Sequence, residues 1–411
     1  PTPSSAASDV YKRQEKTIVI ELPKDKSIAQ RCAVLNLDFD ERFIGEDVKN
    51  TLEAANQFAQ YSKDLTLNLG NSGTGIRLLT GYIAGSGKKC TLIGDKSLSK
   101  RPMRRISDPL NNWGAKISLR EDKYPPIEIA ESKLQSNFVY ELEIPSAQIK
   151  SCLLLAALSS KTKIEIIENI PSRDHTERLL QECDAEIFKE GNKIIFDGTK
   201  EITKKFIDVP KDFSSAAYLI AANILTNKDI PLEGVGVNKT RTAFLNVLEE
   251  MGAKIKLHNA CTISNEPRAD ITAKFDTNLK GVSISGQSIP NLIDEIPLIA
   301  ILAMFAEGKT TIRDAKELRY KESDRISLLL DNMKKFNPNI GLTEFEDGFE
   351  IIPSKNHDND SVDLETGGDH RIIMSFVIAA LVTGKKINFD ETESVETSFP
   401  GFFEVIKAWY Q

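Results

Sequence analysis

The sequence predicts an α/β (α+β) protein of two domains, in which buried helices alternate with short strands. Three observations support this prediction. The chain has 411 residues, which is too many for one ordinary core and enough for two domains. Hydrophobic residues make up 40% of the chain and charged residues 27%, a composition typical of a globular protein. Two kinds of helix-like segment also recur along the chain, which indicates a fold built from similar units.

The first kind of segment is rich in small residues and apolar on most of its faces, which is typical of a helix buried on all sides. A short stretch with the pattern of a strand follows it. In chain order these segments lie in KSIAQRCAVLNL, SGTGIRLLTGYIAGSGKKCTLI, SAQIKSCLLLAALSSKTKIEII, FSSAAYLIAANILTNKDIPL, IDEIPLIAILAMFAEGKTTI and DHRIIMSFVIAALVTGKKINF.

The second kind of segment is amphipathic, with apolar residues at i, i+3, i+4 and i+7 that place one helix face against a core. The clearest examples are RRISDPLNNWGAKISL, TERLLQECDAEIFK and TRTAFLNVLEEMGAKIKL, whereas EDVKNTLEAANQFA, SDRISLLLDNMKKF and FPGFFEVIKAWY fit more loosely. Together the segments form six units of roughly 70 residues, each helix–strand–helix–strand. Six units predict two domains of three units each, with helices enclosed by sheets. The alternative is an ordinary α/β protein whose helices happen to look alike.

Every buried segment begins with polar or charged residues. A single such start is usually only a helix N-cap, but six of them, several with Arg or Lys added, indicate an anion site. If the helices run parallel within each domain, their positive ends converge on one face, and two such faces could oppose each other across a cleft. The starts are Lys26-Ser27, Asn71-Ser72-Gly73-Thr74, Ser146-Ala147-Gln148, Ser214-Ser215, Asp294-Glu295 and Asp369-His370-Arg371.

Several classes of protein are disfavoured by the composition. The net charge of −7 argues against a general nucleic-acid binder, and no run of about 18 apolar residues predicts a membrane span. The five cysteines form no CxxC pair and the four histidines form no HExxH motif, so we expect a cytoplasmic protein without a metal site. Residues 1–14 lack an apolar stretch and any periodicity, and we interpret them as a disordered or non-native leader.

Nine motifs resemble, in the same order, those of the 5-enolpyruvylshikimate-3-phosphate (EPSP) synthase family, and the match runs from about Leu22 to Pro400. They are LPKDKSIAQR, GNSGTGIR, GDKSLSKRPM, SAQIKSCLLLA, SRDHTERLL, DFSSAA, LIDEIPLIA, ELRYKESDR and GGDHRIIMSF. The resemblance implies a two-domain inside-out α/β barrel, each domain three βαβαββ units around buried parallel helices. One domain would comprise residues 15–22 and 238–411, the other residues 23–237, with the active site in the cleft between them.

The family transfers the enolpyruvyl group of phosphoenolpyruvate (PEP) to the 5-hydroxyl of 3-phosphoshikimate and releases phosphate. By resemblance, Asp294 accepts the hydroxyl proton, Glu322 handles the proton on C3 of PEP, and Lys26 stabilises the charge. The residues implied to bind 3-phosphoshikimate are Lys26, Ser27, Arg31, Ser146, Ala147, Gln148, Arg173, Asp294 and Lys321. Those implied to bind PEP are Lys26, Asn71, Gly73, Arg101, Gln148, Arg325 and Arg371. No cofactor is required, no nucleic acid or membrane partner is implied, and we expect a monomer.

The sequence departs from the family pattern at Lys24 and Lys211, where glycines are usual, and these lysines would strain a turn that needs positive φ. The first unit is also short between Leu37 and Leu69, so it could lack part of its sheet. Two alternatives stay open: an enolpyruvyl transferase acting on UDP-N-acetylglucosamine, disfavoured because GDKSLSKR contains no Cys, and a non-catalytic paralogue that binds phosphorylated ligands. Since Gly73 leaves room beside the phosphate of PEP, we expect inhibition by glyphosate.

Overall fold

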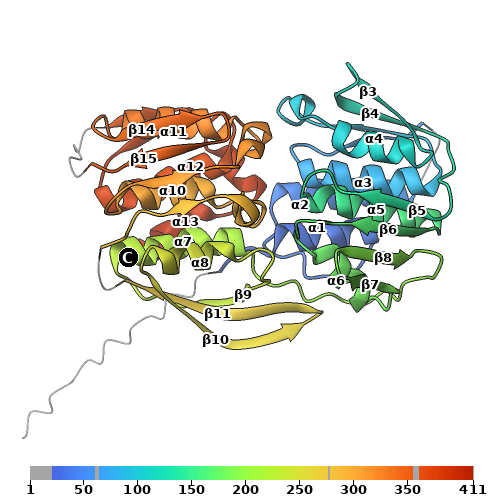
Figure 1. The fold of residues 1–411 in the computed structure, drawn as a ribbon, viewed down its shortest axis with the longest axis horizontal. Coiled ribbons are helices and arrows are strands. Elements are labelled where there is room, and N and C mark those ends of the chain that lie inside the picture. The colour runs from blue at the N-terminus through green and yellow to red at the C-terminus, as the bar shows by residue number, and fades with distance from the viewer. Residues whose placement is uncertain (1–20, 61–63, 276–277, 355–360, 411) are drawn as a thin grey trace, which may run out of the picture.

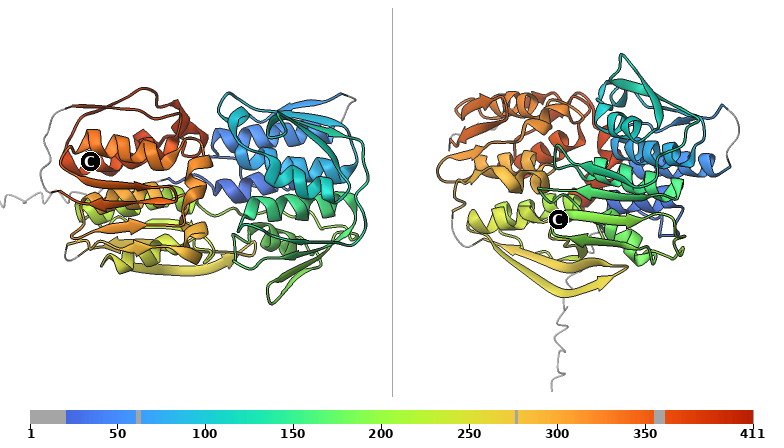
Figure 2. Two further views of the ribbon diagram at one scale, coloured as in Figure 1. Left: turned by 45° about the horizontal axis from the view of Figure 1, so that its top comes forward. Right: turned by 45° about the vertical axis from the view of Figure 1, so that its right-hand side comes forward.

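The computed structural model describes residues 21–60, 64–275, 278–354 and 361–410, so the leader expected at residues 1–14 lies outside the described residues. Figures 1 and 2 show two lobes side by side, each with helices that run in a common direction. In the described ranges, no helix has both the length and the apolar character that crossing a membrane demands.

The first lobe contains the elements from α1 to β8. Its helices are α1 (Lys26–Leu35), α2 (Glu46–Ala59), α3 (Gly73–Ser86), α4 (Arg104–Asn112), α5 (Ala147–Ser160) and α6 (His175–Glu182). Its strands are β1 (Thr66–Asn68), β2 (Cys90–Ile93), β3 (Lys116–Arg120), β4 (Tyr124–Ala130), β5 (Phe138–Glu141), β6 (Lys163–Ile167), β7 (Ile187–Glu190) and β8 (Lys193–Asp197).

The second lobe contains the elements from α7 to α13. Its helices are α7 (Phe213–Thr226), α8 (Ala243–Glu250), α9 (Ile289–Leu292), α10 (Ile296–Met304), α11 (Arg325–Phe336), α12 (His370–Thr383) and α13 (Phe402–Tyr410). Its strands are β9 (Leu232–Gly236), β10 (Lys254–Ile263), β11 (Glu266–Lys274), β12 (Ser283–Ile284), β13 (Thr310–Ile312), β14 (Gly341–Phe345), β15 (Gly348–Ile352), β16 (Val362–Leu364) and β17 (Ile387–Phe389).

The predicted repeat is visible in the strand order. The sheets β1-β2-β4-β3, β5-β6-β8-β7 and β12-β13-β15-β14 have the same topology, each from a βαβαββ unit whose first two strands are parallel. The sheet β10-β11-β9 follows the same order, with a single parallel bridge from Lys211 to Val235 in place of a first strand.

Three of the six units depart from the expected βαβαββ pattern within the described residues, and the unit of β9 to β11 is one of them, because its first strand is reduced to that bridge. The first unit has only the bridge between Phe39 and Ile207 before α2, as its short sequence suggested. The last has the parallel pair β16-β17 and no following hairpin, because the chain reaches α13 instead.

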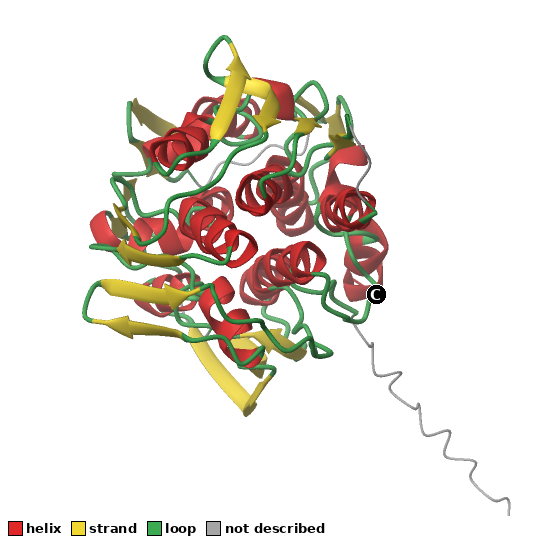
Figure 3. Cartoon of the chain, turned by 90° about the vertical axis from the view of Figure 1, so that its right-hand side faces the viewer, coloured by secondary structure: helices red, strands yellow, loops and turns green. Residues whose placement is uncertain are grey.

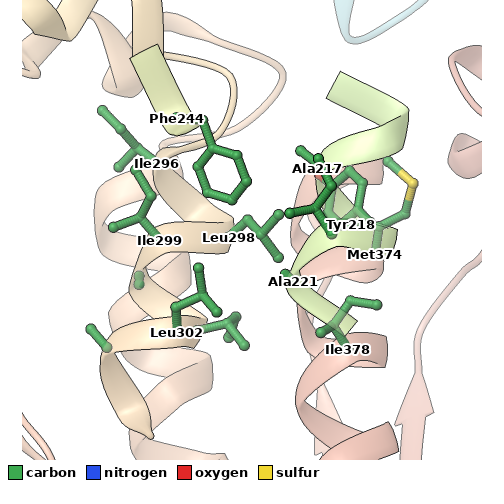
Figure 4. Close-up of a cluster of buried hydrophobic side chains, with 14 of the residues drawn as sticks. Ala217, Tyr218, Ala221, Phe244, Ile296, Leu298, Ile299, Leu302, Met374 and Ile378 are labelled. Atoms are coloured by element: carbon green, nitrogen blue, oxygen red, sulfur yellow. The ribbon is translucent and has the colours of Figure 1, made fainter. Parts of the chain in front are cut away.

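The small-residue helices lie inside each lobe, as predicted. In Figure 3, viewed along the helices, the strands lie around the periphery and helices fill the interior. Glycines allow α3 and α5 to pack closely: a Cβ on Gly81 would lie 2.0 Å from the carbonyl oxygen of Cys152. In the second lobe, Figure 4 shows Leu298 of α10 pointing toward Ala217 and Ala221 of α7.

The two hydrophobic cores define the domains. One core runs from Ile28 to Val209 and is the N-terminal domain; the other contains Leu22 and residues from Phe213 to Trp409 and is the C-terminal domain. The border expected between 237 and 238 therefore differs from the border between the cores. The physical reason is that α7 and β9 bury their apolar side chains in the C-terminal core, which leaves three units on each side.

The strain expected at Lys24 and Lys211 is absent. Neither residue has a positive φ, and the two face each other in an antiparallel bridge where the chain crosses between domains. Extended backbone of this kind accommodates any side chain, so a glycine is not needed at either position.

Candidate active site

A cavity of about 650 Å³ lies between the two domains, and both domains contribute to its lining. The lining includes the first residues of α1, α3 and α5 from the N-terminal domain and of α7 and α12 from the C-terminal domain. Because backbone N–H groups at helix starts carry partial positive charge, this convergence favours anionic ligands despite the negative net charge.

N-cap hydrogen bonds hold these helix starts in place. The side chains of Asp25, Ser72, Ser146, Asp212 and Asp369 cap α1, α3, α5, α7 and α12, respectively. The polar residues that follow each cap are therefore presented to the cavity in a fixed orientation. In addition, Gln148 donates from Nε2 to Oγ1 of Thr74 over 2.9 Å, which joins the starts of α5 and α3.

Most of the residues expected in the site line this cavity. They are Lys26, Ser27, Gly73, Arg101, Ser146, Ala147, Gln148, Arg173, Asp294, Lys321, Glu322 and Arg371. The other three, Arg31, Asn71 and Arg325, lie behind the lining and reach it through neighbouring side chains or backbone.

Arg31 is buried beneath the start of α1. Its Nε donates to Oγ1 of Thr176 over 2.7 Å, its Nη2 to Oγ of Ser151 over 2.8 Å, and its Nη1 to the carbonyl of Ser27 over 2.6 Å. Burial lowers the pKa of Arg31 to about 10, so the side chain stays charged at neutral pH. In this arrangement Arg31 supports the backbone of Ser27.

Asp294 lies just before α10 and is surrounded by cations. Its Oδ2 accepts a hydrogen bond from Nη2 of Arg173 over 2.7 Å, and its Oδ1 lies 3.7 Å from Nε of Arg371. Burial alone would raise the pKa of Asp294, but Arg371, Arg173, Lys321 and Arg325 hold it well below its usual range. Asp294 is therefore ionised and able to accept a proton.

Glu322 has the same kind of surroundings. Its Oε1 accepts a hydrogen bond from Nη1 of Arg101 over 3.3 Å, and its Oε2 from Nη2 of Arg325 over 2.5 Å. Burial alone would raise the pKa of Glu322, but Arg325 and Arg101 hold it well below its usual range. Arg325 in turn donates from Nε to Asp369, the N-cap of α12, over 2.7 Å.

Arg101 of the N-terminal domain has partners in both domains. Besides Glu322, it binds Oδ1 of Asn71, whose own Nδ2 donates to Asp95 over 2.8 Å. Asn71 therefore orients Arg101 rather than lining the cavity itself. A Cβ on Gly73 would lie 2.6 Å from Nη1 of Arg101, so the glycine leaves room for this guanidinium.

Three ion pairs join the domains along the cavity, each between an arginine of the N-terminal domain and a carboxylate of the C-terminal domain. They are Arg101–Glu322, Arg105–Glu317 and Arg173–Asp294, at 3.3, 2.6 and 2.7 Å. The carboxylates thus occupy positions on the arginines that an anionic ligand would take. Bidentate binding of carboxylate or phosphate by a guanidinium would compete directly with these pairs.

Lys26 and His370 also line the cavity. Nζ of Lys26 lies 3.0 Å from Oδ2 of Asp47, and its backbone N–H donates to Asp212 over 3.0 Å. Burial and the charge of Lys26 lower the pKa of His370 well below its usual range, so its imidazole is neutral at neutral pH.

The lining residues that were missed in the sequence include Arg105, Glu317, Tyr218 and Arg241. Helical spacing could have identified Tyr218, which follows Ser214 by four residues on α7. Arg105 and Glu317 lie four residues from Arg101 and Lys321, but both of these have extended backbone outside an α-helix. Arg241 lies in a loop, and no local pattern points to it. No cluster of three His, Cys, Asp or Glu side chains suited to a metal ion occurs among the residues that the structure describes.

Comparison with known proteins agrees with the resemblance. A family model described as EPSP synthase (3-phosphoshikimate 1-carboxyvinyltransferase) matches residues 14–406. The 3-phosphoshikimate 1-carboxyvinyltransferase of Petrotoga mobilis is 40% identical over 417 residues, which cover 94% of this chain and 96% of that protein. The protein of the same name from Thermoanaerobacter sp. is also 40% identical, over 96% of this chain and 98% of its own.

Solved structures show the same fold. EPSP synthase from Acinetobacter baumannii superposes with a TM-score of 0.77 at 36% identity and covers 94% of each chain. The enolpyruvyl transferase NikO from Streptomyces tendae, with a TM-score of 0.73 over 95% of this chain and 94% of its own, is only 14% identical and supports the fold alone. These findings exclude an ordinary α/β protein with chance similarity among its helices. The chain belongs to the EPSP synthase family.

Proposed function

We propose that this protein transfers the enolpyruvyl group of PEP to the 5-hydroxyl of 3-phosphoshikimate and releases phosphate. One observation carries the proposal: a single cavity gathers helix starts, arginines and two ionised carboxylates from both domains. The two substrates carry phosphates and carboxylates, so they match the cationic groups, and the transfer needs a proton acceptor and a proton donor.

Binding is assigned by position in the cavity. 3-Phosphoshikimate would contact Ser27, Ser146, Ala147, Gln148 and Arg173 on the N-terminal side and Asp294 and Lys321 on the C-terminal side. PEP would contact Lys26, Gly73, Gln148, Arg101 and Arg371. Arg31, Asn71 and Arg325 act behind these residues, through Ser27, Arg101 and Glu322 respectively. The bonds that support this assignment are those described above.

The addition step forms a bond between the 5-oxygen of 3-phosphoshikimate and C2 of PEP. Asp294 accepts the hydroxyl proton while protonated Glu322 donates a proton to C3. Glu322 would take up this proton from solvent: when Arg101 turns from Glu322 to PEP, the pKa of Glu322 rises because a neighbouring positive charge is engaged elsewhere. In the same way, 3-phosphoshikimate draws Arg173 from Asp294, which becomes a stronger base.

The elimination step reverses the transfer at C3. Glu322 takes a proton back from C3, the C2–O bond to phosphate breaks, and the departing phosphate takes up the proton that Asp294 received. Lys26, together with Arg101 and Arg371, would stabilise the charge on the phosphate, a preorganised electrostatic role. We expect the protein to work as a monomer in the cytoplasm.

The test is phosphate release by the purified protein. Release with PEP and 3-phosphoshikimate together, and not with PEP and UDP-N-acetylglucosamine, supports the proposal. Release only with UDP-N-acetylglucosamine would assign the other enolpyruvyl transfer. Binding of 3-phosphoshikimate without release would identify a non-catalytic binder.

A further inference from the structure

The two segments that cross between the domains have nearly the same sequence. Residues 23–27 read PKDKS and residues 210–214 read PKDFS. They pair as a local twofold: the amide of Asp25 donates to the carbonyl of Pro210, and the amide of Asp212 to the carbonyl of Pro23, both over 2.8 Å. We call these ten residues the PKD junction.

The PKD junction buries two carboxylates at two helix starts. Asp25 caps α1 of the N-terminal domain by accepting from the amide of Ile28 over 3.0 Å. Asp212 caps α7 of the C-terminal domain by accepting from the amide of Ser215 over 2.9 Å. Their side chains are only 2% and 5% exposed, so the pair needs a buried positive charge nearby.

Arg241 supplies that charge. Its guanidinium lies 3.7 Å from Oδ2 of Asp25 through Nη1 and 3.5 Å from Oδ2 of Asp212 through Nη2, and its side chain is 4% exposed. Burial alone would lower the pKa of Arg241, but Asp25 and Asp212 raise it, so the side chain stays charged. One arginine thus neutralises the caps of one helix from each domain.

The same guanidinium binds two serines that line the cavity. Nη1 donates to Oγ of Ser27 over 3.2 Å, and Nη2 donates to Oγ of Ser214 over 2.9 Å. A guanidinium has no acceptor, so both serine oxygens must accept these bonds. Ser214 therefore donates its own hydrogen to Glu295, and the hydrogen of Ser27 is left to donate elsewhere.

We propose that Arg241 is a positioning residue for the phosphorylated acceptor substrate. By donating to Ser27 it fixes that hydroxyl as a donor toward an anion in the cavity, and by bridging Asp25 and Asp212 it holds the starts of α1 and α7 at a constant separation. The inference rests on the proposed function, because it takes Ser27 as a ligand of 3-phosphoshikimate. Arg241 acts on the substrate through Ser27.

The test is the kinetics of Arg241→Lys and Arg241→Gln. Lysine keeps a charge beside Asp25 and Asp212, but it lacks the planar guanidinium that donates to Ser27 and Ser214 at the same time. We expect both variants to raise the KM for 3-phosphoshikimate about tenfold, as for the loss of one charge-assisted hydrogen bond, with the KM for PEP and kcat changed less than about twofold. Calorimetric titration with 3-phosphoshikimate alone should show the same loss of affinity without turnover.

The matched control is Arg268→Gln. Arg268 of β11 also joins the domains, with its Nη1 3.2 Å from Oδ2 of Asp208, but it does not line the cavity. The Arg268→Gln variant should leave the KM values for 3-phosphoshikimate and for PEP unchanged. If Arg241→Gln folds poorly, Asp25→Asn/Arg241→Gln removes one buried charge while asparagine keeps the cap; we expect it to regain thermal stability but not affinity for 3-phosphoshikimate.

Three outcomes would overturn the inference. They are an unchanged KM for 3-phosphoshikimate in a folded Arg241 variant, equal increases in both KM values, or full recovery of affinity in the double variant. Failure of the proposed function is a separate result, since it would appear as no turnover in the unmodified protein.

Discussion

Replacing Gly73 by alanine should weaken PEP binding selectively. The new Cβ would lie 2.6 Å from Nη1 of Arg101 and 3.2 Å from Nη1 of Arg77, whereas ordinary contact begins at 3.4 Å. Arg101 must therefore withdraw by about 0.8 Å (3.4 − 2.6). Such a shift distorts at least one charge-assisted hydrogen bond from Arg101 to PEP. The loss weakens PEP binding by about 1.5–3 kcal/mol, which raises the KM for PEP roughly tenfold to hundredfold.

Initial rates of phosphate release measure this effect, with each substrate varied in turn. The KM for 3-phosphoshikimate serves as the internal control and should change less than about twofold, because Gly73 lies beside Arg101 and Arg77. The melting temperature of Gly73→Ala should be unchanged, since the displaced atom, Nη1 of Arg101, lies at the end of a flexible side chain. Glyphosate should compete with PEP in the unmodified protein and inhibit Gly73→Ala less. An unchanged KM for PEP in a folded Gly73→Ala variant would refute the reasoning.

Three further predictions concern the carboxylates and the core. Asp294→Asn should lower kcat by about 10²-fold or more with little change in either KM, because it removes the proton acceptor. Single-turnover rates would measure this loss, and near-normal turnover would contradict the role of Asp294 as proton acceptor. The lowered pKa values of Asp294 and Glu322 stabilise the fold above the ordinary carboxyl pKa of about 4, and this stabilisation is lost as the pH falls. Urea midpoints between pH 7 and pH 3 should therefore fall less in Glu322→Gln; equal falls would exclude Glu322 as a contributor. Gly81→Ala should destabilise the protein by about 2–3 kcal/mol in urea unfolding, since its Cβ would lie 2.0 Å from the carbonyl oxygen of Cys152, and an unchanged midpoint would show that α3 and α5 can separate.

The sequence predicted the helices well because small, apolar segments with polar starts have few other ways to be buried. The run from Gly73 to Ser86 is an example: its glycines permit close packing, and its polar start lines the cavity. The expected α/β fold and family are confirmed by the matching family model and the superposed A. baumannii structure.

Long-range pairing could not be predicted from local patterns. The partners Arg101 and Glu322 are separated by 221 positions, so nothing in either motif shows that this arginine and this carboxylate form an ion pair. The domain border was misplaced for a related reason: α7 resembles the N-terminal buried helices in sequence, and only packing shows which core it joins. The strain expected at Lys24 likewise depended on a φ angle that composition does not determine.

The central claim is that two anionic substrates meet in the cavity between the domains. A crystal structure with 3-phosphoshikimate and an unreactive PEP analogue tests it most directly. We predict the 3-phosphate beside Ser27 and Ser146, the analogue on Arg101 and Arg371, and Asp294 next to the 5-hydroxyl. Ligands bound outside the cavity, or to only one domain, would contradict the account.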